Sequence, residues 1–249
     1  MASVNVLDDG IAVAEATAER LTELAAGAVE TFGAATLCLT GGSTPERLYR
    51  LLADPARPWR GRIAWPLAHL FWGDERHVPP DHSDSNYGMA ASALIDHVPV
   101  PRQQVHRMRG ELPDAHDAAR EYEVALRDGF ARAQRHDQTF DVMLLGLGED
   151  AHIASIFPGS PLLHDASGCR VAALWAPHLE AWRITLTPSA IVDARAIVML
   201  VSGEKKALAV RAALEFPTDV DRYPVHVLRA ADARVEWFVD RAAAGRRAN

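Results

Sequence analysis

The chain has 249 residues, 49% of them hydrophobic, and a formal net charge of −7 at pH 7. This length suits one large α/β domain, and we expect a single domain over residues 1–249, with two small domains as the alternative. The acidic balance argues against a nucleic-acid surface, and no apolar run approaches the roughly 18 residues of a membrane span, so we expect neither partner.

Composition also bears on compartment and ligands. The segment 1–9 is polar and acidic, unlike a signal peptide, and Cys38 and Cys169 do not make a disulfide framework. These features fit a reducing cytoplasm. Of 26 basic residues only Lys205 and Lys206 are lysines. An anionic ligand of so acidic a chain requires a local cationic pocket.

Short apolar runs alternate with amphipathic stretches along the chain. In chain order the pattern predicts a helix at 8–32, a strand at 36–40, a helix at 45–52, a strand at 69–72, helices at 85–95 and 113–136, strands at 142–145, 171–174 and 184–186, a helix at 188–193, a strand at 197–201, a helix at 204–214, a strand at 225–228 and a helix at 231–243. The alternation indicates a three-layer, Rossmann-like α/β fold whose mostly parallel sheet carries helices on both faces.

The first glycine-rich junction is Leu39-Thr-Gly-Gly-Ser-Thr-Pro45. Gly41 and Gly42 permit positive φ and close backbone approach, and Ser43 or Thr44 can cap the following helix, with Glu46 completing a capping box from Ser43. Free N–H groups and the helix dipole at this point suit a phosphate. An ordinary capped glycine turn is the alternative. The segment is not a Walker A loop, because no Gly-Lys-Ser/Thr follows.

The second junction, 71–80, places Asp74, Glu75 and Arg76 directly after a strand. Three consecutive charged side chains cannot point the same way, so we expect one acid to pair internally and another to reach a cleft. A solvated charged turn is the alternative, and the flanking aromatic residues and prolines argue against it.

The third junction, 141–159, runs from a strand through Gly146 and Gly148 to Asp150 and His152. Ligands of open α/β sheets bind at the carboxyl ends of strands, so this histidine is a candidate general base that Asp150 could orient. The G-x-G-x-x-A match of residues 146–151 to a dinucleotide fingerprint is rejected, because Pro158 cuts the following helix short.

Two further strand-to-helix junctions carry cations, Arg183 and Lys206. Each is ordinary alone, and a surface salt bridge is the alternative reading. All five junctions together resemble, in order and over about residues 8–243, the 6-phosphogluconolactonase family, which shares its fold with glucosamine-6-phosphate deaminases. The matching segments are 40–45, 73–76 with 78–79 and 85–87, 146–150 with 152 and 154–159, 183–187, and 203–207.

This resemblance implies hydrolysis of 6-phospho-D-glucono-1,5-lactone with no cofactor and no metal. His152 would activate water, and Asp150 would orient the His152 imidazole. Arg76 or glycine-loop N–H groups would stabilise the oxyanion, and Asp74 would bind sugar hydroxyls or position water. A second set would hold the 6-phosphate: Gly41, Gly42, Ser43, Thr44, Arg183 and Lys206.

The chain departs from the family's pattern at one place. The family usually has Gly-His-Thr where this chain has Ala151-His152-Ile153. Because Ala151 would resist positive φ, we expect a slightly repositioned loop.

Two rival functions stay open. The first is a deaminase or isomerase of amino-sugar phosphates, against which Arg76 argues, since the resembling deaminases carry tyrosine there. The second is a sugar-phosphate-binding regulator without turnover. For oligomeric state we expect a monomer or a weak homo-oligomer.

Overall fold

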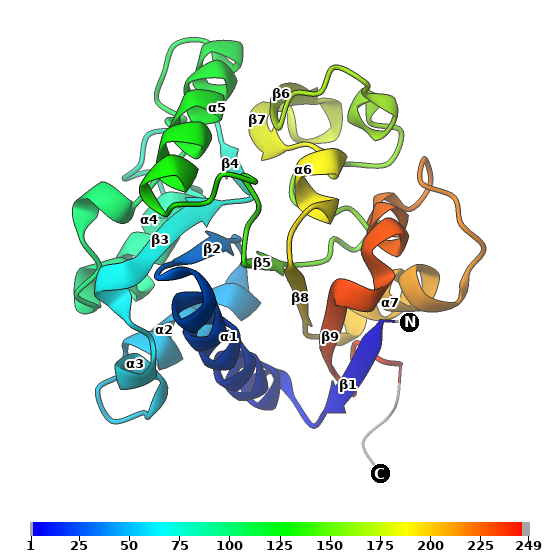
Figure 1. Cartoon of the computed structure of the whole chain (residues 1–249). Coiled ribbons are helices and arrows are strands. Elements are labelled where there is room, and N and C mark those ends of the chain that lie inside the picture. Colours follow the sequence, from blue (N-terminus) through cyan, green and yellow to red (C-terminus); the bar gives the residue numbers. More distant parts are fainter. Residues whose placement is uncertain (1, 246–249) are drawn as a thin grey trace.

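A six-stranded, fully parallel sheet in the order β1-β9-β8-β5-β2-β3 forms the centre of the protein in the computed structural model, which describes residues 2–245 (Figure 1). Its strands are β1 (Ser3–Leu7), β2 (Ala35–Leu39), β3 (Ala68–Trp72), β5 (Val142–Leu145), β8 (Ala196–Val201) and β9 (Val235–Asp240). The chain runs from β2 to β3 on one side and then returns to β5 on the other side of β2. Ligands of open α/β sheets bind at such a reversal of strand order, beyond the carboxyl ends of the strands.

Helices cover both faces of this sheet, as the alternation of strands and helices predicted. They are α1 (Gly10–Phe32), α2 (Ser43–Ala53), α3 (Trp59–Arg62), α4 (Asn86–Ala93), α5 (Ala115–Arg132), α6 (Pro188–Val192) and α7 (Ala207–Glu215). Helices α1 to α4 pack on one face, and α5, α6 and α7 pack on the other. Among the described residues, no helix combines the length and the apolarity needed to cross a bilayer.

Alternation along the central strands divides the core into two layers. In β5, Val142 and Leu144 belong to the layer under α1 and α2, whereas Met143 and Leu145 belong to the layer under α5 and α7. Because successive side chains of a strand point to opposite faces, a strand buried on both sides is apolar throughout. This is why the central strands appear in the sequence as short continuous apolar runs.

A second, antiparallel sheet of three strands lies beyond the main sheet in the order β4-β7-β6. It contains β4 (Asp74–Arg76), β6 (Val171–Ala176) and β7 (Ala181–Leu186), and Figure 1 shows it at the top of the view, away from α1 and α2. The register pairs Asp74 with Thr185 and Arg76 with Arg183. The small sheet therefore brings the second junction beside Arg183, 107 positions later in the chain.

The C-terminal part of the sequence prediction was wrong in two elements. Residues 225–228, expected as a strand, lie in the 3₁₀ segment Pro224–Arg234, and β9 (Val235–Asp240) replaces the helix expected at 231–243. The alanines around β9 favour a helix locally. However, Val235, Trp237 and Val239 are buried in the layer of α5 and α7 while the strand pairs with both β1 and β8, so sheet pairing decides its conformation. Strand β1, within the segment read only as a polar terminus, was not predicted.

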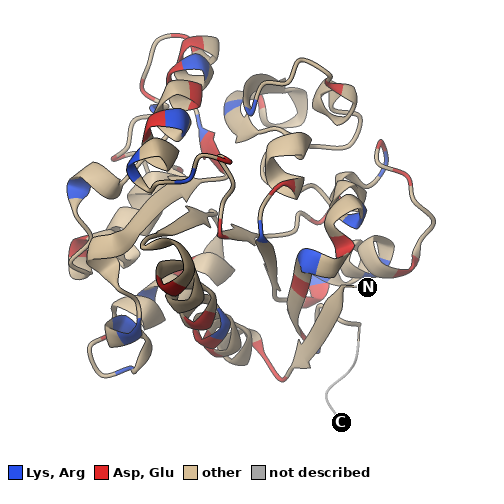
Figure 2. Cartoon of the chain, viewed as in Figure 1, with Lys and Arg blue, Asp and Glu red and all other residues tan. Residues whose placement is uncertain are grey.

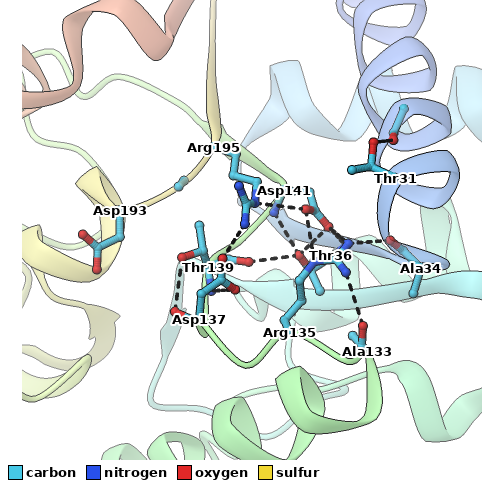
Figure 3. A network of polar contacts seen from close by, with 12 residues as sticks. Thr31, Ala34, Thr36, Ala133, Arg135, Asp137, Thr139, Asp141, Asp193 and Arg195 are labelled. Carbon is cyan, nitrogen blue, oxygen red and sulfur yellow. Dashed lines mark hydrogen bonds and ion pairs between the residues drawn. The ribbon is translucent and has the colours of Figure 1, made fainter.

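A buried ion pair clamps the amino-terminal ends of β2 and β5 (Figure 3). Arg135 and Asp141 are 2% and 4% exposed, and Arg135 Nη2 donates to Asp141 Oδ2 at 2.7 Å and to the Ala34 carbonyl at 2.6 Å. Asp141 Oδ2 also accepts from Thr36 N and Oγ1. Since each member of the network has partners, the cost of burying the two charges is offset only while both are present.

Removing one charge of this pair should destabilise the fold strongly. We expect Arg135→Ala to lower the free energy of unfolding by about 3–5 kcal/mol, because Asp141 would keep a buried charge without its cation. Urea unfolding at pH 7 measures the change. Arg195→Ala is the matched control: Arg195 Nε lies 3.6 Å from Asp141 Oδ1, but its side chain is 40% exposed, so the loss should stay below about 1 kcal/mol. Equal losses in the two variants would contradict this account of the clamp.

Candidate active site

A cavity of about 370 Å³ opens at the carboxyl edge of the main sheet. Most of the predicted site residues line it: Gly41, Gly42, Asp74, Arg76, His152, Arg183 and Lys206. A second cavity of about 180 Å³ adjoins it and is lined by Ser43 and Thr44 together with Gly41, Gly42 and Lys206. The loops after β2, β3, β5 and β8 thus meet at one place, because the four strands are parallel and end at the same edge.

His152 and Asp150 form a hydrogen-bonded pair in the loop after β5. Asp150 Oδ1 lies 2.6 Å from His152 Nδ1 and 3.2 Å from the His152 backbone nitrogen. Partial burial opposes ionisation of Asp150, but the hydrogen bond and charge of His152 more than offset it and lower the pKa of this carboxyl to about 2. A carboxylate on Nδ1 favours the tautomer in which Nε2 is unprotonated. His152 lines the cavity, whereas Asp150 is not among the lining residues of either cavity.

Gly148 is required beside this pair. A Cβ at Gly148 would lie 2.0 Å from His152 Nδ1 and 2.5 Å from Asp150 Oδ1, well inside contact distance. The backbone closes the loop at the same place, where Gly148 N donates to the His152 carbonyl at 2.9 Å. The second glycine of the junction therefore provides room for the acid–histidine contact.

Ala151 adopts the positive φ that it was expected to resist, so the premise of a repositioned loop was wrong. Ala151 has φ +67° and is 1% exposed, so an alanine occupies a left-handed position that favours glycine. The Ala151 carbonyl accepts from Val225 N, and its nitrogen donates to the Gly148 carbonyl. Ile153 is fully buried in the layer of α5 and α7. These contacts hold the loop in the strained conformation, and the 149–159 segment contains no helix.

The loop after β2 begins a helix without a side-chain cap. Gly42, at φ +109°, is the N-cap of α2, so Ser43 is already the first helical residue, and the capping role predicted for Ser43 or Thr44 is wrong. The capping box is absent as well, since Glu46 pairs with Arg50. An uncapped helix start leaves backbone N–H groups available for an anion, and Ser43 and Thr44 line the cavity beside them.

The two acids of the second junction point to different places, as the sequence predicted. Asp74 lines the cavity and is 7% exposed. Glu75 is 2% exposed and accepts from the backbone nitrogens of Arg76, Asn86 and Tyr87 at 2.7–2.8 Å. Burial raises the pKa of Glu75, and these hydrogen bonds oppose the rise. Glu75 thus holds the start of α4 against β4 and leaves the cleft to Asp74.

The cationic side chains of the cavity are Arg76, Arg183 and Lys206. Arg76 Nη1 donates to the Asp84 carbonyl at 2.5 Å, and Arg183 Nη1 donates to the Trp182 carbonyl at 3.1 Å. Burial and then the charge of Arg76 lower the pKa of Arg183. Acidic and basic residues are mixed on the outer helices α1, α5 and α7 (Figure 2), so the positive charge of the cavity is local in an acidic protein.

Sequence reasoning did not assign several of the lining residues to the site, among them Asn86, Ser155, Phe157 and Leu179. Asn86 and Ser155 are polar, 2% exposed or less, and lie within the segments that carried the family resemblance, which is the signal that could have found them. Phe157 packs against the His152 ring with centroids 4.7 Å apart. No such signal marks Leu179, which reaches the cavity from the turn between β6 and β7. Within residues 2–245 there is no cluster of three or more side chains suited to hold a metal ion.

An acid–histidine pair, an uncapped helix start and three cationic side chains lie at one sheet edge of this α/β protein, an arrangement that suits an anionic ligand. The chain belongs to the family described as glucosamine-6-phosphate isomerases/6-phosphogluconolactonase, whose model matches residues 8–237. It is 39% identical over 216 residues to a 6-phosphogluconolactonase of Mycobacterium bovis, covering 85% of each chain.

Solved structures agree with this family. A 6-phosphogluconolactonase from Trypanosoma brucei superposes with a TM-score of 0.81 at 26% identity, covering 98% of each chain. A monomeric glucosamine-6-phosphate deaminase has a TM-score of 0.80 at 22% identity and covers 98% of this chain and all of that one, which shows the shared fold alone.

A methyl group added at Gly148 should push the side chains of Asp150 and His152 apart. We expect Gly148→Ala to fold but to lose about a hundredfold or more in kcat for hydrolysis of the phosphorylated lactone, the substrate that the family resemblance implies. Misplacing a reacting group by about 1 Å has an effect of that size. The control is Gly146→Ala, since, apart from residue 146 and its two chain neighbours, no atom of the described residues lies within 4 Å of a Cβ at Gly146. Its kcat should fall far less. Steady-state kinetics with NMR of the His152 ring measures both effects, and an unperturbed His152 resonance in Gly148→Ala would contradict the prediction.

Proposed function

We propose that this protein hydrolyses 6-phospho-D-glucono-1,5-lactone to 6-phospho-D-gluconate in the oxidative pentose phosphate pathway. The single observation that carries the proposal is that His152, hydrogen-bonded to Asp150, lines a cavity that is also lined by Arg183, Lys206 and the Gly41-Gly42 loop. A lactone ester needs a base for water and a site for its oxyanion, and a 6-phosphate needs cations and N–H donors. The relatives named as 6-phosphogluconolactonases support this choice of substrate.

His152 is the proposed general base. Its Nδ1 is held by Asp150, which leaves Nε2 to take a proton from water as the water oxygen attacks the lactone carbonyl carbon. The ionised Asp150 stabilises the imidazolium that forms, because its pKa of about 2 keeps it charged at neutral pH. When the ring C–O bond breaks, the imidazolium returns the proton to the leaving ring oxygen.

The charge that develops on the carbonyl oxygen is assigned to Arg76 or to backbone N–H groups of the glycine loops. Arg76 is suited to this role because the Asp84 carbonyl fixes one of its terminal nitrogens while the side chain lines the cavity. Donors that are fixed before the reaction stabilise a developing charge without reorganisation. Asp74 is assigned to the sugar hydroxyls or to the attacking water.

The 6-phosphate is assigned to the uncapped start of α2, with Lys206 at the junction of the two cavities. Gly41, Gly42, Ser43 and Thr44 provide the donors there, and Lys206 adds a charge-assisted bond. Arg183 lies opposite Arg76 and lines only the larger of the two cavities. Its proposed contact with the phosphate therefore comes from the side of the small sheet.

We further propose that residues 1–249 act as a single catalytic domain in the cytoplasm, without a cofactor, as a monomer or a weak homo-oligomer. The proposal for the compartment rests on Cys38 and Cys169, which are both free thiols. Size-exclusion chromatography with light scattering tests the oligomeric state.

The function is tested by generating the lactone with glucose-6-phosphate dehydrogenase and following acid release with and without the protein, after subtraction of spontaneous hydrolysis. We expect a large acceleration by the wild type. His152→Ala should lose about 10²–10⁴-fold in kcat with a modest change in KM, because the base acts mainly in the transition state. A kcat within a few-fold of wild type would remove His152 from this role. Release of ammonia from glucosamine 6-phosphate would favour the deaminase instead.

The phosphate assignment predicts a selective binding defect. Lys206→Ala and Arg183→Ala should raise KM for the phosphorylated lactone about tenfold or more, since each removes a charge-assisted hydrogen bond. Their effect on unphosphorylated glucono-1,5-lactone should be small. The adjacent Lys205→Ala is the matched control, as Lys205 lines neither cavity. Equal losses on both lactones would disprove the phosphate assignment.

A further inference from the structure

Neutral side chains hold both oxygens of the Asp74 carboxylate. Ser155 Oγ donates to Asp74 Oδ2 at 2.6 Å, and Asn86 Nδ2 donates to Asp74 Oδ1 at 3.3 Å and to the Asp74 carbonyl at 2.9 Å. Neither donor carries a charge. The two donors approach the Asp74 carboxylate from different elements, so together they fix its direction.

Ser155 comes from the same loop as His152. It is 1% exposed, and its backbone nitrogen donates to Thr185 Oγ1 at 3.3 Å. Thr185 is the cross-strand partner of Asp74 in the pairing of β7 with β4. Ser155 therefore ties the irregular loop after β5 to the small sheet at the position of Asp74. Because this loop has no helix or strand of its own, it needs such a contact to hold His152 at a constant distance from Asp74.

Asn86 comes from the other side, at the first residue of α4. It is 2% exposed, and a Cβ at Gly41 would lie 1.8 Å from Asn86 Oδ1. The carboxamide thus packs directly on the backbone of the glycine loop assigned to the phosphate. The Asn86 carboxamide fills the space between the Gly41 loop and Asp74, so the position of Asp74 depends on the position of that loop.

We propose that Ser155 and Asn86 are positioning residues that set Asp74 between the His152 loop and the Gly41 loop, so that a lactone bound by its phosphate meets Asp74 and His152 in one geometry. This inference rests on the proposed lactonase function. Its physical basis is that a catalytic group misplaced by about 1 Å can lose about a hundredfold in rate. Neither residue touches the reacting atoms in this scheme, and each acts through Asp74.

The test is a pair of double-mutant cycles in the coupled lactonase assay. Ser155→Ala and Asn86→Ala are each made in the wild type and in Asp74→Asn. In the wild type we expect each to lower kcat about ten- to a hundredfold. KM for the phosphorylated lactone should stay within about threefold in Ser155→Ala and rise further in Asn86→Ala, because the Asn86 carboxamide also packs on the Gly41 loop. In Asp74→Asn the same substitutions should lower kcat less than about threefold, because residues that act through one group are strongly non-additive.

Ser160→Ala is the matched control. Ser160 is a buried serine at the end of the same loop, 6% exposed, and its hydroxyl accepts from Leu162 N at 3.4 Å, away from Asp74. It should leave kcat within about twofold in both backgrounds, as expected for a residue with no shared partner. Thermal melting of each variant establishes that it is folded. Should Ser155→Ala not fold, the Asn86→Ala cycle decides alone, since the backbone bond of Asn86 to Glu75 is kept.

The outcomes separate the two proposals. Additive losses in the cycles, or an unchanged kcat in the single variants, overturn the positioning role while the lactonase function stands. A wild type that does not exceed spontaneous hydrolysis overturns the proposed function, and the inference with it. Losses that disappear in Asp74→Asn support the positioning role, because a merely structural defect would persist in that background.

Discussion

The parallel register of β2, β3, β5 and β8 is the constraint on which the site depends. Parallel strands in adjacent positions end at the same edge, so four loops far apart in the chain deliver their residues to one cavity. The strand order reverses beside β2, which separates the loops after β2 and β5 enough to leave a crevice. The buried Arg135–Asp141 pair clamps the opposite ends of β2 and β5 and so stabilises the two strands that flank this crevice.

The small antiparallel sheet adds what the parallel sheet cannot provide. Its β4 continues directly from β3, and pairing with β7 places Arg183 opposite Arg76 and Thr185 opposite Asp74. A cationic pair and a buried acid therefore share one wall of the cavity. Glu75, which lies between Asp74 and Arg76 in β4, points away from the cavity and holds the start of α4. This three-residue strand therefore serves both the fold and the site.

Small residues in the loops govern the remaining geometry. Gly148 leaves room for the His152–Asp150 contact, and Gly41 leaves room for the Asn86 carboxamide. Ala151 shows that the left-handed position in the histidine loop tolerates a Cβ when the surrounding hydrogen bonds determine the backbone. The site is thus built from close backbone contacts, which explains why its residues cluster in glycine-containing junctions.

The sequence by itself determined the fold class, most strands and the strand-end positions of Asp74, His152 and Lys206, because apolar runs and glycine junctions are local signals. Only the tertiary structure decided that Val235–Asp240 is a strand, since pairing with β1 and β8 overrides the helical preference of its neighbours. It also decided that Gly42 takes the N-cap position of α2 and leaves the helix without a side-chain cap, and that Ser155 and Asn86 hold Asp74. Such contacts join residues far apart in the chain, 81 positions in the case of Ser155 and Asp74, and no local pattern in the chain encodes them.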